Sequence, residues 1–140
     1  MKVRDFQTDA EVASLVAAFE SGTISPSEFS HAAHIAVALA YLAAAPLPKA
    51  SDRMRRSLRL FVSQHHSSGY HETLTLFWMK LLDHLATTRY SGLPLWERIN
   101  QIVATHGSKW PVEAHYSKEA VSSTFARETW VEPDRLPLSF

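Results

Sequence analysis

The chain contains no cysteine, and this absence excludes several classes of site at once. Disulfide bridges, iron–sulfur clusters and zinc sites built on thiolates all require cysteine side chains. The chain also has no excess charge of either sign, because 14 Lys and Arg balance 14 Asp and Glu. A chain without net charge has no long-range field to attract a phosphate backbone, so we expect no nucleic-acid partner.

Long apolar runs are missing as well. The most apolar stretch, residues 32–47, is rich in alanine and too short to cross a bilayer. Residues 1–11 are polar and acidic and contain no apolar segment of the kind found in a signal peptide. We therefore expect a cytoplasmic protein with no membrane partner. With 140 residues, of which 46% are hydrophobic, the chain is long enough to form one domain, residues 1–140, with a buried core.

Apolar residues recur with the period of an α-helix through most of the chain, and no segment alternates as a strand does. The segments 8–11 (TDAE) and 25–28 (SPSE) are typical capping boxes, which predict helix starts at both places. Ser51 and Ser117 are the expected caps of two later helices. The predicted helices span residues 8–22, 25–45, 51–65, 70–89, 94–107 and 117 onward. Short connections make sequence neighbours antiparallel, so the fold should be an all-α, single-domain bundle of five to six helices.

The segment 25–45 is apolar on almost every side apart from His31 and His34, which predicts a buried, central helix. The last helix carries Val121 and Phe125 at the spacing of an inward face. Antiparallel packing gathers the starts of the second, fourth and sixth helices and the ends of the third and fifth at one pole. Seven of the eight histidines fall at this pole, and only His84 does not. The seven are His31, His34, His65, His66, His71, His106 and His115.

Some of these histidines need no functional explanation. The helix dipole and the free carbonyl groups favour histidine at a helix C-terminus, which accounts for His65, His66 and His106. The pair His31 and His34 is different, because a helix N-terminus disfavours imidazolium and a buried imidazole needs partners for both nitrogens. The two are three residues apart, about 60° around a helix, so both rings can approach one point.

His71 and Glu72 begin the fourth helix at the same pole. Several imidazoles with one carboxylate suit Fe(II), Zn, Ni, Mn or Cu(II), so the sequence predicts a site for a divalent transition metal with open positions for substrate. The candidate ligands are His31, His34, His71, Glu72 and His115. Glu72 has a second explanation, because a carboxylate in the first turn of a helix complements the dipole without any further function.

Four blocks of sequence carry a resemblance to a protein family. They are FSHAAH at 29–34, GYHET at 69–73, HYS at 115–117, and AR at 126–127 followed by WVEPD at 130–134. Together they resemble a family of small bacterial helical proteins with no assigned activity, and the likeness extends from about Phe19 onward. In that family, position 115 is often Tyr. The resemblance implies functional positions at His31, His34, His71, Glu72, Tyr116, Ser117, Arg127 and Asp134.

Tyr116 and Arg127 are candidate catalytic residues in addition to Glu72. Arg127 has two possible roles, because it stands near the end of the last predicted helix. It can pair with Glu132 or Asp134 to fix the C-terminal segment, or it can bind a substrate carboxylate. The four tryptophans, Trp78, Trp96, Trp110 and Trp130, are candidates for the core or for a lid.

Three functions are compatible with these patterns. The first is a metal-dependent oxygenase or hydrolase acting on a small molecule, in which Glu72 is a ligand or the general base for a bound water. The second is a metal-free acid–base enzyme, in which His71 and Glu72 work beside a buried pair of histidines. The third is a non-enzymatic protein that binds a ligand or partner and whose histidines are buried core groups or pH-sensitive contacts.

Overall fold

The computed structural model describes residues 5–65 and 69–140, and His66 lies outside these ranges. Within them the secondary structure is helical without a strand, which confirms the expected all-α fold. The five longer helices are α1 (Asp9–Glu20), α2 (His31–Ala44), α3 (Leu47–His65), α4 (Glu72–Thr88) and α5 (Leu95–His106). The three short ones are α6 (Val112–His115), α7 (Lys118–Ser122) and α8 (Thr124–Glu128). None of the described helices combines the length and the apolar character that a membrane span requires.

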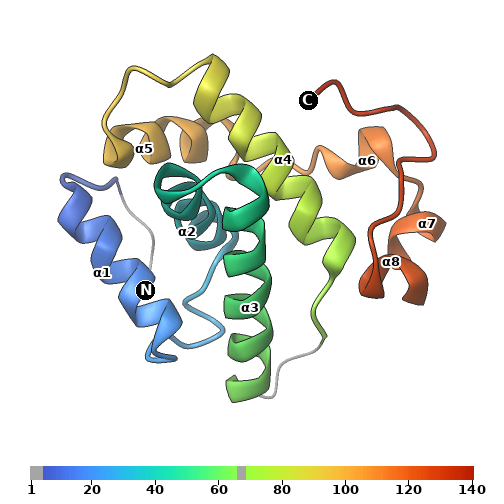
Figure 1. Cartoon of the computed structure of the whole chain (residues 1–140), viewed down its shortest axis with the longest axis horizontal. Helices are drawn as coiled ribbons and strands as arrows, with labels where there is room; N and C mark the ends of the chain where they lie inside the picture. Colours follow the sequence, from blue (N-terminus) through green and yellow to red (C-terminus); the bar gives the residue numbers. More distant parts are fainter. Residues whose placement is uncertain (1–4, 66–68) are drawn as a thin grey trace.

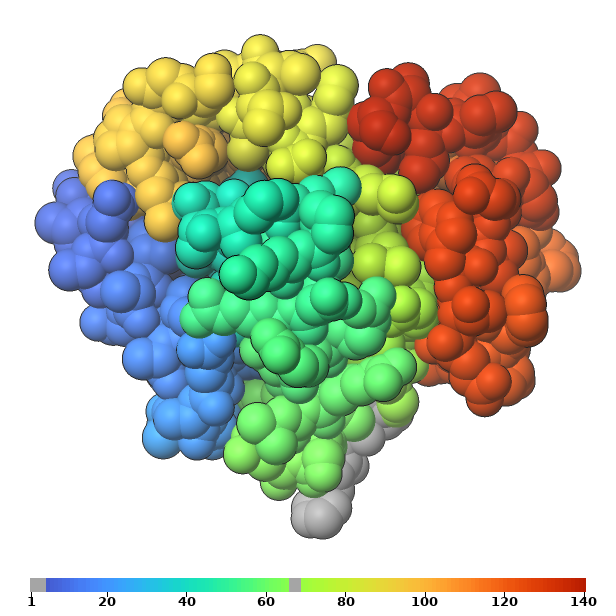
Figure 2. Space-filling model, viewed as in Figure 1, coloured from blue at the N-terminus to red at the C-terminus, as the bar shows by residue number. Residues whose placement is uncertain are grey.

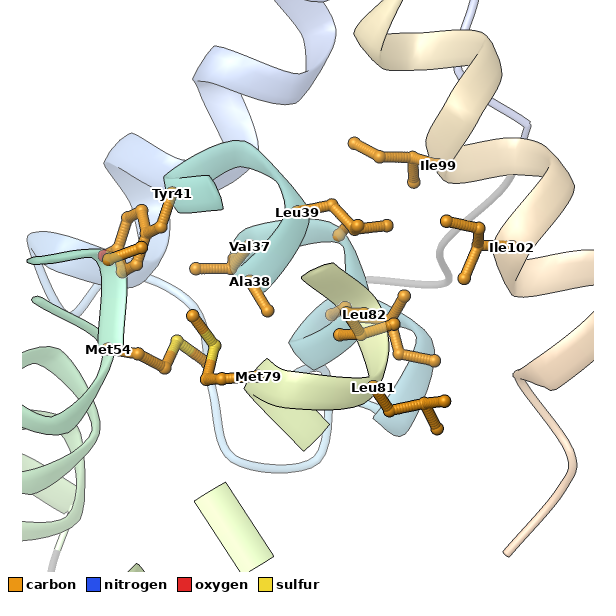
Figure 3. Packing of buried hydrophobic residues seen from close by; sticks show 14 of the residues in the cluster. Val37, Ala38, Leu39, Tyr41, Met54, Met79, Leu81, Leu82, Ile99 and Ile102 are labelled. Carbon is orange, nitrogen blue, oxygen red and sulfur yellow. The ribbon is translucent and has the colours of Figure 1, made fainter. Parts of the chain in front are cut away.

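Helix α2 occupies the centre of the bundle, as its composition predicts. Helices α1, α3, α4 and α5 all pack against it, and in Figure 1 it lies behind α3, between α1 and α4. Val37 and Leu39 of α2 are buried, and Figure 3 shows Leu39 facing the isoleucines of α5. Helices α6 to α8 and the C-terminal segment lie on the other side of α4 and form the orange and red part of the surface in Figure 2.

The second capping box forms, but it does not start the long helix. The backbone N–H of Ser25 donates to Glu28 Oε1 at 3.2 Å, and the backbone N–H of Glu28 donates to Ser25 Oγ at 3.3 Å. These bonds close one turn, and α2 begins only at His31. The prediction of a helix from residue 25 is wrong because Ser30 is itself a strong N-cap residue. Its backbone is extended and its side chain accepts the N–H of Ala33, so His31 is the first residue of α2.

Helix α3 begins earlier than predicted, at Leu47 instead of directly after the expected cap Ser51. Pro48 explains the difference, because proline fits the first turn of a helix, where a backbone N–H has no partner to lose. Ser51 is buried within the helix and is not a cap.

The single last helix expected after Ser117 is divided into α7 and α8. Ser123 has an extended backbone and its side chain accepts the N–H of Ala126, so it ends one helix and caps the next. The expectation that Phe125 faces inward is wrong, because the break changes the direction of the chain and leaves this side chain 67% exposed. Helix α6 was not predicted, since a helix of one turn has no apolar period to detect.

Candidate functional site

A cavity of about 320 Å³ lies between α2, α3 and α4. Its apolar wall consists of Ile35, Ala38, Met54, Leu58, Val62, Leu74, Met79 and Leu82, several of which are visible in Figure 3. Its polar wall consists of His31, His34, Tyr70, His71, Thr75, Trp78 and Trp110, and Gly69 completes the lining. No Asp, Glu, Lys or Arg is present among the described residues that line it. The fold therefore brings three of the predicted site histidines to one apolar cavity.

His34 is the second histidine of α2 in the cavity wall. Its ring lies against Phe29, with the ring centroids 4.0 Å apart, and it belongs to the second turn of α2. Burial, together with the neighbouring His31, lowers the pKa of His34 to about 4, so the imidazole is neutral at pH 7. No side-chain hydrogen bond joins this ring to any residue in the described ranges. The ring of His34 therefore lines the cavity without a hydrogen-bond partner among the described residues.

His31 belongs to an aromatic cluster at the edge of the cavity. Its ring meets Trp78 edge-on, with the centroids 4.6 Å apart, and Trp110 is 6.1 Å from both. His31 Nε2 and Trp78 Nε1 are buried and have no hydrogen-bond partner among the described residues. The edge-on geometry lets an N–H of one ring approach the π face of the other, which offsets part of the cost of burial. Burial also lowers the pKa of His31.

His71 contributes to the cavity wall but uses both of its ring nitrogens elsewhere. Nδ1 accepts the backbone N–H of Leu74 at 3.1 Å, which makes His71 the N-cap of α4. Because Nδ1 accepts, the proton is on Nε2, which donates to the carbonyl of Val121 at 2.7 Å. The neutral ring thus caps the N-terminus of α4 and connects this helix to α7. Neither nitrogen is free to bind a metal while these bonds exist.

Glu72 is the first residue of α4, and its carboxylate faces α3 rather than the cavity. Arg55 donates to it from Nε at 2.9 Å and from Nη2 at 2.8 Å, and the Tyr70 hydroxyl donates to Oε1 at 2.6 Å. The hydrogen bonds from Arg55 are the main reason why the pKa of Glu72 is lowered. Burial, followed by the bond to Glu72, raises the pKa of Tyr70 to about 12. The ionised Glu72 therefore anchors Tyr70, whose ring lines the cavity.

His115 and Tyr116 lie away from the cavity, under the C-terminal segment. The ring of His115 is 5.6 Å from that of Phe77, and its Nδ1 donates to the carbonyl of Leu136 at 2.8 Å. The Tyr116 hydroxyl donates to the carbonyl of Val131 at 2.6 Å, and burial raises its pKa to about 12. Both side chains hold the C-terminal segment against the bundle, and neither lines the cavity.

Arg127 and Asp134 do not pair with each other. Asp134 Oδ1 accepts the backbone N–H of Ser117 at 2.8 Å, so it supports the start of α7. Glu132 accepts the indole N–H of Trp130 at 2.9 Å. No salt bridge of Arg127 occurs within the described part of the chain. Its Nη1 would lie 3.6 Å from a Cβ placed on Gly69, so the guanidinium stands near the rim of the cavity.

The other histidines in the described ranges do not line the cavity. His65 packs against Phe61, with the ring centroids 4.5 Å apart, and its Nε2 is buried without a partner among the described residues. Burial and the nearby charges of Lys109 and Arg89 lower the pKa of His106. His84 packs against Phe140. Of the seven histidines expected at one pole, three line the cavity, and His65 is connected to His34 through the rings of Phe61 and Phe29.

The predicted metal ligands are not assembled into a coordination site. Within residues 5–65 and 69–140, no group of three or more His, Cys, Asp or Glu side chains is placed to hold one ion. His71 is committed to two hydrogen bonds, Glu72 is committed to Arg55 and Tyr70, and His115 lies under the C-terminal segment. The donor set that remains is His31 with His34, which is fewer ligands than a stable site requires. The residues present do not fit a transition metal in this arrangement.

No model of a known protein family matches the chain, and no curated protein or solved structure does so either. The function must therefore be inferred from the cavity itself. The sequence alone did not identify Tyr70 as a cavity residue, and it gave Trp110 only as one of four candidates for the core or for a lid. Tyr70 directly precedes the candidate residue His71, so its position in the sequence could have indicated that it lies near the site. Trp110 reaches the cavity from the connection between α5 and α6, and no spacing in the sequence predicts this contact.

Proposed function

We propose that this protein binds a small, largely apolar molecule in the cavity between α2, α3 and α4. The observation that carries the proposal is His34, a neutral imidazole that lines the cavity and has no partner among the described residues. A ring nitrogen that lines a cavity and has no hydrogen bond to the protein can form one with a bound molecule. Such a bond contributes roughly 0.5–1.5 kcal/mol to binding.

The size of the cavity supports the same proposal. Its volume of about 320 Å³ is roughly twice that of an engineered cavity of about 150 Å³ that binds benzene. It also falls at the lower end of the range for small-molecule sites, about 300–1,000 Å³. A molecule with two fused six-membered rings, or an aliphatic chain of comparable volume, is therefore the natural occupant.

A metal-dependent reaction has less support at this position. It needs His71 and Glu72 to leave hydrogen bonds that hold the start of α4 and the wall of the cavity. Glu72 as a general base has the same difficulty, because its lowered pKa and its contacts with Arg55 make it a weak proton acceptor that faces away from the cavity. Ligand binding requires none of these changes.

A matched pair of substitutions in α2 tests the proposal. Ala38 lines the cavity, so Ala38→Leu places additional carbon atoms inside it, whereas Ala43→Leu adds the same atoms on the exposed side of the same helix. The measurement is isothermal titration calorimetry with 2-naphthol, supported by the thermal midpoint of each variant. We expect the wild type and Ala43→Leu to bind and Ala38→Leu to lose at least tenfold in affinity. Equal binding by all three, or binding by none, would overturn the proposal.

A further inference from the structure

The absence of charge from the cavity wall indicates what kind of molecule it accepts. Resting on the proposed function, we infer that the ligand is electrically neutral and presents one hydroxyl-type group to His34. None of the described lining residues has a formally charged side chain, and the walls are mainly aliphatic and aromatic. An ion that enters such a cavity loses its hydration without gaining a partner of opposite charge, which costs far more than the transfer of a neutral molecule.

The ion pair between Glu72 and Arg55 lies behind the cavity wall. Glu72 is bound by Arg55, and Arg59 lies over the ring of Tyr70 at 4.9 Å. The Tyr70 hydroxyl donates to Glu72, so this phenol does not offer its proton to the cavity. Tyr70 therefore contributes its ring, and no charge, to the binding surface.

His34 determines which polar group the ligand should have. A neutral imidazole carries one N–H donor and one nitrogen acceptor. A hydroxyl can donate to the acceptor or accept from the donor, so it satisfies His34 in either tautomer, whereas a carbonyl can use only the donor. His71 cannot substitute for His34, because both of its nitrogens are engaged, and His31 Nε2 is enclosed in the aromatic cluster with Trp78. The geometry thus favours an alcohol or a phenol over an amine, a carboxylate or a pure hydrocarbon.

Arg127 defines the competing hypothesis. Its guanidinium stands near Gly69 at the rim of the cavity and forms no salt bridge within the described residues. If this side chain turned toward the cavity, a carboxylate would become the preferred ligand. The two hypotheses make opposite predictions for molecules that have the same shape and a different charge.

The experiment compares 2-naphthol, naphthalene and 2-naphthoate by isothermal titration calorimetry at pH 7.5. We expect 2-naphthol to bind the wild type, naphthalene to bind roughly fivefold to tenfold more weakly because it lacks one hydrogen bond, and 2-naphthoate not to bind. In His34→Leu the difference between 2-naphthol and naphthalene should disappear. The control is His84→Leu, which makes the same substitution outside the cavity and should retain the wild-type difference.

The outcomes separate this inference from the proposed function. Equal binding of 2-naphthol and naphthalene by the wild type would overturn the inference and leave the binding function intact. Tighter binding of 2-naphthoate, lost in Arg127→Gln, would establish the carboxylate alternative and also overturn it. If none of the three molecules bound, the proposed function would fail, and the inference with it.

Discussion

The Tyr70 hydroxyl donates a hydrogen bond of 2.6 Å to Glu72 Oε1, although Tyr70 lines the cavity and Glu72 does not. The bond connects the wall of the candidate site to an ion pair between α3 and α4, since Arg55 binds the same carboxylate. Glu72 is therefore a positioning residue for the cavity. This role differs from that of a metal ligand or general base, and it makes separate predictions for stability and for binding.

Replacing Glu72 by Gln should destabilise the fold. The change keeps the shape of the side chain but removes the charge that Arg55 binds, so a partly buried guanidinium loses its main partner. We expect the free energy of unfolding to fall by about 2 kcal/mol. Urea denaturation measures the loss. Asp52→Asn is the matched control, because Asp52 also pairs with Arg55 but is 68% exposed, and its loss should stay below about 0.5 kcal/mol. Equal losses would refute the positioning role.

His71 should be required for the stability of α4. In His71→Ala, the N-cap bond to Leu74 and the bond to the carbonyl of Val121 are both lost. We expect a destabilisation of about 1–3 kcal/mol. His71→Asn should recover part of it, because asparagine is a good N-cap residue, but it is too short to reach α7. Urea midpoints of the three proteins provide the measurement, and an unchanged midpoint in His71→Ala would show that these bonds contribute nothing.

Stability should decrease at acidic pH because His34 is buried as the neutral imidazole. An unfolded histidine takes up a proton near pH 6.5, whereas folded His34 does so only at about pH 4. Below pH 6.5 the unfolded chain therefore binds more protons than the folded chain, and the free energy of unfolding falls by up to about 2 kcal/mol between pH 8 and pH 5. The titratable neighbours at the cavity wall are His31, Tyr70 and His71, and α3 contributes no titratable side chain to it.

The pH dependence is measured by urea midpoints at pH 5, 6, 7 and 8. In His34→Leu the decrease between pH 8 and pH 5 should be clearly smaller, because the group with the most strongly lowered pKa among the cavity histidines is gone. His84→Leu should keep the wild-type slope. A wild-type midpoint that does not change with pH would mean that His34 is accessible to protons in the folded state.

Metal content distinguishes the present account from the metal centre that the sequence predicts. Elemental analysis of protein purified without a histidine tag is the measurement. A metal centre requires about one ion per chain, lost in His31→Ala and retained in His84→Ala. Our account expects the same metal content in both variants and in the wild type, because the ligand set is not assembled. A stoichiometric metal that disappears only in His31→Ala would require a rearranged site and would contradict it.

The sequence was sufficient to predict the features that depend on local pattern. The apolar character of α2 predicted its central position, and the spacing of His31 and His34 predicted that their rings could approach one point. Both side chains line the cavity. Both inferences remained valid although α2 begins later than expected, because the position of a side chain around a helix does not depend on where the helix starts.

The neighbours that the other candidate side chains contact in the fold could not be predicted from the sequence. Glu72 follows His71 directly, yet one side chain turns to Arg55 and the other contributes to the cavity wall. That choice depends on how α3 packs against α4, which the helical period does not specify. His115 was misplaced for a similar reason, since its neighbours Leu136 and Phe140 come from an irregular C-terminal segment.

The ring nitrogens of His34 offer the most direct test of the account. In a long-range ¹H–¹⁵N spectrum of the histidine side chains, titration with 2-naphthol should shift the nitrogen resonances of His34, because the ligand hydroxyl binds there. The resonances of His84, which packs against Phe140 away from the cavity, should not move. A saturating titration that leaves His34 unchanged, or that shifts His84 to the same extent, would contradict the claim that a small neutral molecule binds in this cavity.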